Sequence, residues 1–424
     1  MSMLGNRTLG VTYPLLALSL TGSPFDVGWA GFGLTLPTLV VYLPAGVIVD
    51  RFPPRLIMLA CQAVRGLAAL TVSALLALGE LRMAYLMVGA IAEGTMWVLY
   101  TVAETALIQS LASGKTFARA ASASESATHL AVMAGRPLGG LLFGLDRAVA
   151  FAGDAALFLA SFLSLLAIPD AGRPPGTASG ADRGVGRLTP RSLYREVSEG
   201  VTALWGNRFL REAVAVTAVT NLMVNTVITV FLAGSADISP AQVGLALAMG
   251  GLGGSIGSVG APWLFRRLPS LRSTPTLFLQ VWIWCLALAV AAVLRPPYSF
   301  ALAVLLTGIT GSLGNVAIRL EELGKIPGDR IARAMSAHRL VVHGVVCLAA
   351  PVGGVLVARL GVADGMVFLV AVMLAFALLF TARWWARGRR GRGGATAPRR
   401  LRPRLLTSLV AGLHEDEVSP ITRK

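Results

Sequence analysis

The sequence predicts an all-helical integral membrane protein with twelve transmembrane helices, arranged as two parallel six-helix repeats. Composition is the first observation: 55% of the residues are hydrophobic and only 14% are charged, whereas roughly a quarter of the residues of soluble domains are charged. The mean hydropathy of +0.70 agrees with this. The other two observations are the number of apolar segments and an internal duplication.

The duplication consists of two motifs that recur after about half the chain length. The motif Ser-Pro-x-x-Val-Gly occurs at Ser23–Gly28 and again at Ser239–Gly244. A longer match begins at Ala118 and Ala332, passes through His129 and His343, and ends in Pro-x-Gly-Gly at Pro137, Gly139, Gly140 and at Pro351, Gly353, Gly354. Two hydrophobic halves in the same orientation, meeting at a central interface, are the plan of a large group of secondary transporters.

A membrane-crossing helix needs about 20 predominantly apolar residues, and clusters of Pro, Gly and charge divide the chain into twelve such segments. In the first half the expected spans are 4–21, 27–49, 56–78, 83–109, 127–145 and 150–168. In the second half they are 210–233, 242–265, 275–294, 298–319, 336–359 and 363–385. The eighth span carries glycines that indicate close helix contact and flexing: Gly250, Gly251, Gly253, Gly254 and Gly257.

The first expected span is unusual because its clearly apolar part, Leu9–Leu20, is too short to cross a membrane. Extending it backwards places Asn6 and Arg7 at membrane depth. Either these polar groups line a wet cavity, or the true start codon lies upstream and the helix is truncated. We favour truncation.

The spans divide the chain into an N-terminal half (1–168), a cytoplasmic linker (169–207), a C-terminal half (208–385) and a basic tail (386–424). The linker begins with Gly, Pro and Arg, and from Thr189-Pro190 its apolar residues recur at helical spacing. We expect that part to be an amphipathic helix on the membrane surface. The tail is expected to be disordered near anionic lipid rather than a specific partner site.

Lys and Arg are concentrated in alternate loops, which sets the orientation. One side carries the central Arg-rich stretch, the basic tail and most loop cations, whereas the opposite loops offer only Arg82, Arg147, Arg295 and Arg359. Both termini should therefore be cytoplasmic. The preference for Arg over Lys favours a GC-rich bacterium, so the expected location is the bacterial cytoplasmic membrane.

The loop after the second span reads Gly46-x-x-x-Asp50-Arg51-x-x-x-Arg55, and with it the chain resembles the major facilitator superfamily. Glycine lets two helices approach closely, and a carboxylate among arginines forms a latch that opens in one conformational state. Plain positive-inside charge would explain the arginines but not Gly46 or Asp50. At the equivalent place in the second half stand Arg266 and Arg267, so only the first half keeps the acidic latch.

In the fifth span, Gly135-Arg136-Pro137-Leu138-Gly139-Gly140 resembles the signature of exporters that work by antiport. The family pattern has proline directly after the first glycine, where this chain has Arg136. The resemblance implies a hinge that packs against its counterpart in the eleventh span, with its bend at Pro137, Gly139, Gly140, Pro351, Gly353 and Gly354.

Arg136 lies near mid-membrane, where a lone cation costs at least about 2.5–3.5 kcal/mol. We expect Glu93, at a similar depth on the fourth span, to be its partner. Glu93, Trp97, Tyr100 and Glu104 share one helix face, and the resemblance implies that this face lines the central cavity. The stripe is the leading candidate for a proton and substrate path, against a structural ion pair that never titrates. The family's usual arginine motif in this span is absent.

Other polar intramembrane residues have two readings each. Asn221 and Asn225, with Thr217, form a stripe on the seventh span that could bind substrate or neighbouring helices. His129 and His343 suit either proton handling or an interface role. Arg65 and Asp154 are expected to have packing or boundary roles.

Several function classes are excluded. The sequence contains no nucleophile elbow, no phosphate-binding Gly-Lys-Ser loop and no metal-ligand spacing, so we expect no catalytic residues, metal or cofactor. The net charge of +16 lies in loops between apolar spans rather than on a folded basic face, which argues against nucleic acid. Transport must therefore be driven by an ion gradient or by the substrate's own gradient.

Within the superfamily, the stretch Pro14–Pro24, the Asp50-Arg51 loop and Gly139-Gly140 followed by Phe151-x-x-Asp154 resemble the drug and macrolide efflux branch. The resemblance implies a monomeric exporter, not an enzyme, that exchanges protons for a hydrophobic or amphipathic small molecule, with antibiotic resistance or natural-product export as its role. Two alternatives stay open: an uptake permease or uniporter, and a non-transporting receptor or scaffold.

Overall fold

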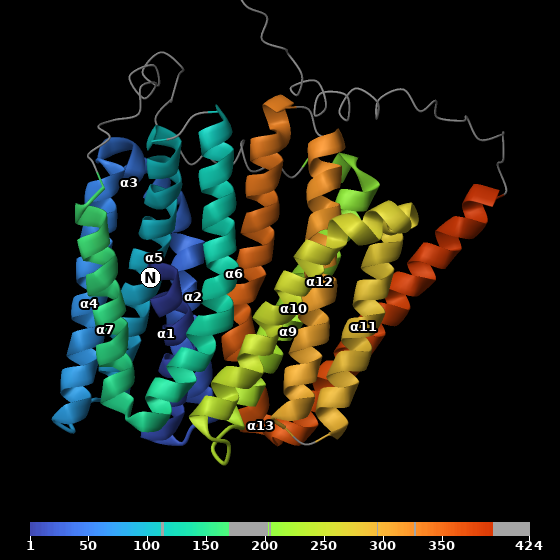
Figure 1. Ribbon diagram of the computed structural model, residues 1–424. Coiled ribbons are helices and arrows are strands. Elements are labelled where there is room, and N and C mark those ends of the chain that lie inside the picture. Colours follow the sequence, from blue (N-terminus) through green and yellow to red (C-terminus); the bar gives the residue numbers. More distant parts are fainter. Residues whose placement is uncertain (112–113, 169–201, 203–204, 295, 326–327, 393–424) are drawn as a thin grey trace, which may run out of the picture. The chain divides into compact units, whose positions relative to one another are not determined.

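The computed structural model describes residues 1–111, 114–168, 202, 205–294, 296–325 and 328–392. These residues form twelve α-helices and one short 3-10 helix, with no strand among them. The helices of the first half are α1 (Ser2–Thr21), α2 (Pro24–Val40), α3 (Tyr42–Arg51), α4 (Pro54–Ala77), α5 (Met83–Leu111), α6 (Gly114–Leu145) and α7 (Arg147–Leu166). Those of the second half are α9 (Arg208–Ala233), α10 (Pro240–Arg267), α11 (Thr274–Val293), α12 (Tyr298–Lys325) and α13 (Gly328–Arg392), with η2 (Pro269–Arg272) before α11. Figure 1 shows them in chain order.

The predicted all-helical membrane fold is confirmed. Eight of the described helices are long and apolar enough to cross a membrane. Three expected spans are divided differently: the second is broken at Val41 into α2 and α3, and the last two run together as α13. Within α13, Gly361 has the left-handed φ of 77°, a backbone shape that favours glycine, and it separates the expected spans 336–359 and 363–385.

Both copies of the Ser-Pro motif begin a helix. Pro24 and Pro240 occupy the first turns of α2 and α10, where proline's missing N–H and fixed φ are no disadvantage. The Ser239 hydroxyl accepts a hydrogen bond from the Gln242 N–H at 3.4 Å, which caps α10. At the end of α1, Gly22 adopts a φ of 66° and donates to the Leu18 carbonyl, so the chain turns sharply into α2.

The chain divides into two compact units, Met1–Ala377 and Leu378–Lys424. In the first unit α4 packs against α5 and α7, α1 against α6, and α10 against α6 and α12. The α6–α10 contact therefore joins the two halves of the chain. The described part of the second unit is the end of α13. The predicted amphipathic linker helix and most of the tail lie outside the described residues.

Candidate functional site: a buried ion pair and paired glycine contacts

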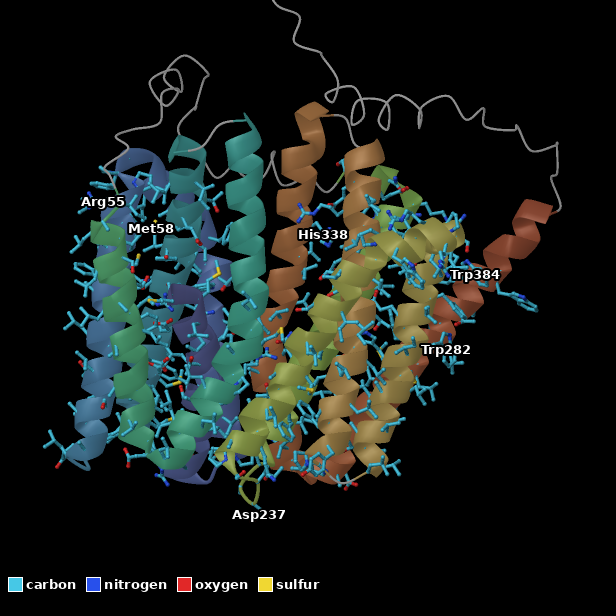
Figure 2. All side chains as sticks on the ribbon, viewed as in Figure 1. Arg55, Met58, Asp237, Trp282, His338 and Trp384 are labelled. Atoms are coloured by element: carbon cyan, nitrogen blue, oxygen red, sulfur yellow. The ribbon has the colours of Figure 1, made fainter. Side chains whose placement is uncertain are left out.

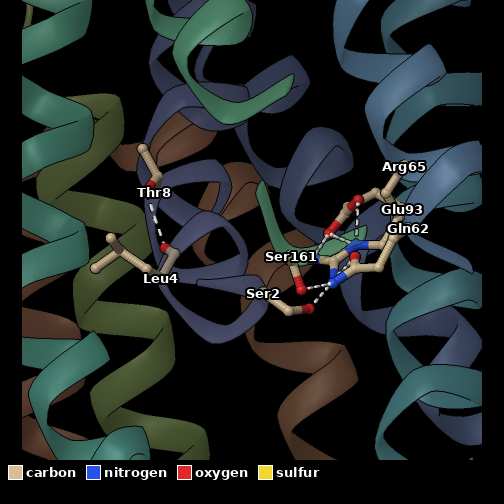
Figure 3. A network of polar contacts seen from close by, with 7 residues as sticks. All are labelled: Ser2, Leu4, Thr8, Gln62, Arg65, Glu93 and Ser161. Atoms are coloured by element: carbon tan, nitrogen blue, oxygen red, sulfur yellow. Dashed lines mark hydrogen bonds and ion pairs between the residues drawn. The ribbon is translucent and has the colours of Figure 1, made fainter. Parts of the chain in front are cut away.

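Arg65 of α4 and Glu93 of α5 form a deeply buried ion pair, with 1% and 2% of their surfaces exposed. Arg65 Nε donates to both carboxylate oxygens of Glu93 at 2.8 and 2.9 Å, and Nη2 also pairs with Oε1. Nη1 donates to Ser2 Oγ at 2.7 Å and to Gln62 Oε1 at 3.4 Å. The Gln62 amide in turn donates to the Ser161 hydroxyl, so one polar network joins α1, α4, α5 and α7 (Figure 3).

Two aromatic rings complete the surroundings of Arg65. Its guanidinium carbon lies 4.1 Å from the centroid of the Phe158 ring and 5.4 Å from that of Trp97. Cation–π contact and charge-assisted hydrogen bonds together satisfy a group that would otherwise be too costly to bury. The expected pairing of Glu93 with Arg136 is therefore wrong. Glu93 faces the first half, and its partner is Arg65.

The α5 stripe also faces the interior of the first half. Tyr100 is buried in an apolar cluster with residues of α3, α4 and α7, and its ring stacks on Trp97 with centroids 6.4 Å apart. Glu104 is partly buried on the same helix. The contacts described for Glu93 and Tyr100 come from within this half, whereas the resemblance implied a face open to a central cavity.

Asp154 of α7 lies beside this network and has the least satisfied side chain of the group. It is fully buried, and neither of its carboxylate oxygens accepts a hydrogen bond within the described part of the chain. Thr8 is close to it, but the Thr8 hydroxyl donates to the Leu4 carbonyl at 2.9 Å. Asp154 also lies near the charged side chains of Glu93 and Arg65 and near the ring of Tyr13.

Sequence reasoning assigned only packing or boundary roles to Arg65 and Asp154. The signal that could have found them is their spacing. Gln62 and Arg65 lie three residues apart on α4, and Asp154, Phe158 and Ser161 recur at four and three on α7. Each set shares one helix face inside an otherwise apolar span.

Arg136 of α6 contacts the second half instead of Glu93. Its Nη1 donates to the Leu247 carbonyl of α10 at 2.8 Å. Arg7 of α1 approaches the same turn of α6, because a Cβ added at Gly135 would lie 2.7 Å from Arg7 Cβ. Both arginine side chains are partly buried. Asn6 and Arg7 therefore both lie inside a helix that packs against α6.

The repeated motifs contact one another in two equivalent places. A Cβ added at Gly28 of α2 would lie 2.7 Å from the Ala350 carbonyl oxygen and 3.0 Å from Gly354 Cα of α13. A Cβ at Gly244 of α10 would clash in the same way with the Arg136 carbonyl oxygen of α6. Ala350 and Arg136 are related by the repeat. We call these two contacts the glycine contacts.

The last glycine of each Pro-x-Gly-Gly motif completes the glycine contacts. A Cβ at Gly354 would lie 2.9 Å from the Pro24 carbonyl oxygen, and one at Gly140 would clash with the Pro240 carbonyl oxygen. The motif Ser-Pro-x-x-Val-Gly of each half therefore packs against Pro-x-Gly-Gly of the other. The expectation that the glycines of the fifth and eleventh spans pack on each other is corrected: they contact α10 and α2. The remaining glycines pack within their own halves, Gly135 and Gly139 on α1 and Gly353 on α9.

Gly46, Arg51 and Arg55 are the residues of the predicted latch whose side chains or surroundings the structure describes. Arg55 of α4 caps the end of α7, with Nε and Nη2 donating to the Leu165 and Leu166 carbonyls at 3.1 and 2.8 Å (Figure 2). A Cβ at Gly46 would meet nothing within 4 Å among the described atoms, so close helix approach does not explain this glycine. Arg51 is exposed. The Asp50 side chain lies outside the described residues, and the latch itself stays a prediction.

In the second half, Asn221 and Asn225 are partly buried on α9, and their amide groups donate to backbone carbonyls one turn earlier at 2.9 and 2.8 Å. A pair that sequence reasoning missed joins α12 and α13: Nδ1 of His338, which is labelled in Figure 2, lies 2.8 Å from Glu322 Oε1. The side chains of His129 and His343 lie outside the described residues.

Comparisons with known proteins agree with this fold. The solved structure of the nucleoside transporter NupG is similar with a TM-score of 0.68 at 12% identity, over 90% of this chain and 97% of that one. A bacterial homologue of the iron transporter ferroportin in an inward-facing state gives 0.64 at 15% identity, over 90% and 94%. A bacterial homologue of the lysosomal transporter Spinster, inward-facing and unoccupied, gives 0.64 at 13%, over 94% and 96%.

At these identities the solved structures establish the fold and not the substrate. No curated protein sequence matches the chain. A family model does match, over residues 1–351, and its description is the Major Facilitator Superfamily. With its two helical halves in contact through repeated glycine motifs, the chain belongs to the Major Facilitator Superfamily of membrane transporters.

Proposed function

We propose that this transporter exports a hydrophobic or amphipathic small molecule in exchange for protons, across a bacterial cytoplasmic membrane with both termini inside. The observation that carries the proposal is the unbonded carboxyl of Asp154 beside the Arg65–Glu93 pair. Buried ionisable groups inside membrane spans are costly and mark ion pathways more often than packing positions. The second half has no described equivalent of this network.

The glycine contacts support transport by alternating access. They join α2 to α13 and α10 to α6, at the helix starts that follow the two Ser-Pro turns. Because the helices touch through glycine backbones, no side chains have to interdigitate, and each contact can break and reform as a whole. In the orientation predicted from loop charges they close the outer side of the protein, and the substrate path opens towards the cytoplasm.

The proton step follows from the number of carboxyl groups around Arg65. The guanidinium is already engaged by Glu93, Ser2 and Gln62, so a second carboxylate at Asp154 lacks a partner among the described residues. A proton bound to an Asp154 oxygen removes that unpaired charge. When the proton leaves, Asp154 competes with Glu93 for Arg65, and the packing of α4, α5 and α7 changes with it. Each transport cycle then moves one proton through this carboxyl.

Proteoliposomes with pyranine trapped inside provide the test. A panel of anionic, neutral and cationic amphipathic compounds is added with and without a pH gradient, and compound and proton movements are recorded together. Antiport predicts proton movement opposite to the compound, lost in Asp154→Asn and kept in the surface variant Arg147→Gln. Compound movement without proton movement would instead support a uniporter, and no movement of either would support a scaffold.

A further inference from the structure

Arg7 and Arg136 bring two positive charges together at the junction between the halves. Gly135 provides the close approach of α1 to α6, and the two charges are near enough to repel each other. Arg136 also reaches α10, where it donates to the Leu247 carbonyl and lies close to Gly250. Within the described part of the chain, neither arginine forms an ion pair.

Arg65 shows how this chain satisfies a permanently buried arginine. It has a carboxylate, a hydroxyl, an amide and two aromatic rings around it. Arg136 has one described hydrogen bond, to a backbone carbonyl, and Arg7 has a second cation as its charged neighbour. Charges held away from water are normally paired, yet among the described residues this pair of partly buried arginines has no counter-charge.

We propose that Arg7 and Arg136 bind the oxyanion group, a carboxylate or phosphate, of an amphipathic organic anion, and that such anions are the transported substrates. This inference rests on the proposed function and specifies its substrate class. Both side chains are partly exposed and therefore reachable. The planar guanidinium fork pairs with carboxylate and phosphate through two parallel hydrogen bonds.

The position of the pair gives the bound anion a part in the transport cycle. Arg136 spans the α6–α10 contact between the halves, and its own backbone carbonyl is the atom that Gly244 packs against. An anion that draws the Arg136 guanidinium away from the Leu247 carbonyl acts directly beside one of the glycine contacts. Substrate binding and the opening of that contact are thereby linked.

The test uses four compounds that share one ring system: 1-naphthoate, 1-naphthyl phosphate, the neutral 1-naphthamide and the cation 1-naphthylmethylammonium. The melting temperature of the purified full chain in nanodiscs is followed as each is titrated without any gradient. The two anions are expected to raise it in a concentration-dependent manner, because ligands that bind only the folded state stabilise it. The amide and the cation are expected not to.

Four variants separate the site from other causes. Arg7→Gln and Arg136→Gln are each expected to weaken anion binding about tenfold or more, whereas the exposed Arg147→Gln is expected to leave it unchanged. Arg136→Lys keeps the positive charge but lacks the planar guanidinium fork, so its anion affinity should lie between those of the wild type and Arg136→Gln. Without ligand, Arg7→Gln should raise the melting temperature, since it removes a repulsion.

The proposal is overturned if neither anion shifts the melting temperature, if the amide shifts it equally, or if anion binding survives both glutamine substitutions. A lower melting temperature of ligand-free Arg7→Gln would likewise overturn it by making the arginine structural. Because the assay uses no proton gradient, anion binding without coupled proton flux would contradict the antiport proposal and leave the anion site standing. Proton flux coupled only to uncharged compounds would contradict the anion site and leave the antiport proposal standing.

Discussion

Replacing Gly28 by alanine tests whether the glycine contacts set the balance between conformational states. The added Cβ would lie 2.7 Å from the Ala350 carbonyl oxygen and 3.0 Å from Gly354 Cα, whereas ordinary contact begins at 3.4 Å. Both neighbours are backbone atoms of α13, which cannot rotate away as a side chain can. The helices must separate, so the penalty applies only to the state in which the two motifs touch.

The size of the effect follows from the cost of overpacking. One extra methyl group in a well-packed contact costs about 1–3 kcal/mol. A change of that size shifts a two-state equilibrium about 5–150-fold. Gly28→Ala is therefore expected to move a protein that rests mainly in the closed arrangement to a mixture, or to the opposite state.

Hydrogen–deuterium exchange measured by mass spectrometry detects the separation of α2 from α13 directly. Peptides that cover residues 24–31 and 347–356 should exchange faster in Gly28→Ala than in the wild type. Gly260→Ala on α10 is the matched control, because its Cβ meets nothing within 4 Å among the described atoms and alanine favours a helix interior. The reasoning is refuted if the two variants exchange alike, or if Gly28→Ala leaves both peptides unchanged.

Three further predictions concern the first half. Glu93→Gln should lower the unfolding free energy by about 3–5 kcal/mol by leaving Arg65 unpaired, and Arg65→Gln in the same chain should recover part of it; a chemical denaturation cycle that gives additive losses would contradict the pairing. Asp154→Asn should keep the fold yet abolish proton flux in pyranine-loaded vesicles; flux at the wild-type rate would show that Asp154 only packs. Arg55→Gln should cost about 1–3 kcal/mol, since it removes charge-assisted hydrogen bonds to the end of α7; an unchanged melting temperature would argue that solvent replaces them.

Much of the fold could be predicted because the bilayer imposes a length on each apolar segment, and Pro, Gly and charge clusters mark the boundaries. The starts of α2 and α10 were predicted only approximately: the expected spans begin at 27 and 242, whereas the helices begin at Pro24 and Pro240, since proline suits the first turn. The break at Val41 was missed. It falls inside a continuous apolar run, where hydropathy gives no signal of a change in helix direction.

The site was predicted less well because depth in the membrane does not say which way a side chain faces. Glu93 and Arg136 were expected at a similar depth, yet Glu93 pairs with Arg65 of α4 and Arg136 donates to α10. Rotation about a helix axis depends on which neighbour it packs against, and that is a tertiary property. The repeat suggested an interface at the glycines. It could not show that the Ser-Pro-x-x-Val-Gly motif of each half contacts the Pro-x-Gly-Gly motif of the opposite half.

The central claim is that the halves transport by moving apart at the contacts between α2 and α13. Cys347 of α13 donates its Sγ–H to the Thr35 carbonyl of α2 at 3.1 Å, so Thr35→Cys in a chain with Cys61 and Cys285 changed to alanine offers a cross-link at that place. The measurement is substrate-driven proton flux in proteoliposomes before and after a short bis-methanethiosulfonate reagent, which joins the two thiols through reducible disulfides, with the Cys347-only chain as the control. We predict that cross-linking reduces flux to background and that a reductant restores it. Full flux in the cross-linked protein would contradict the account.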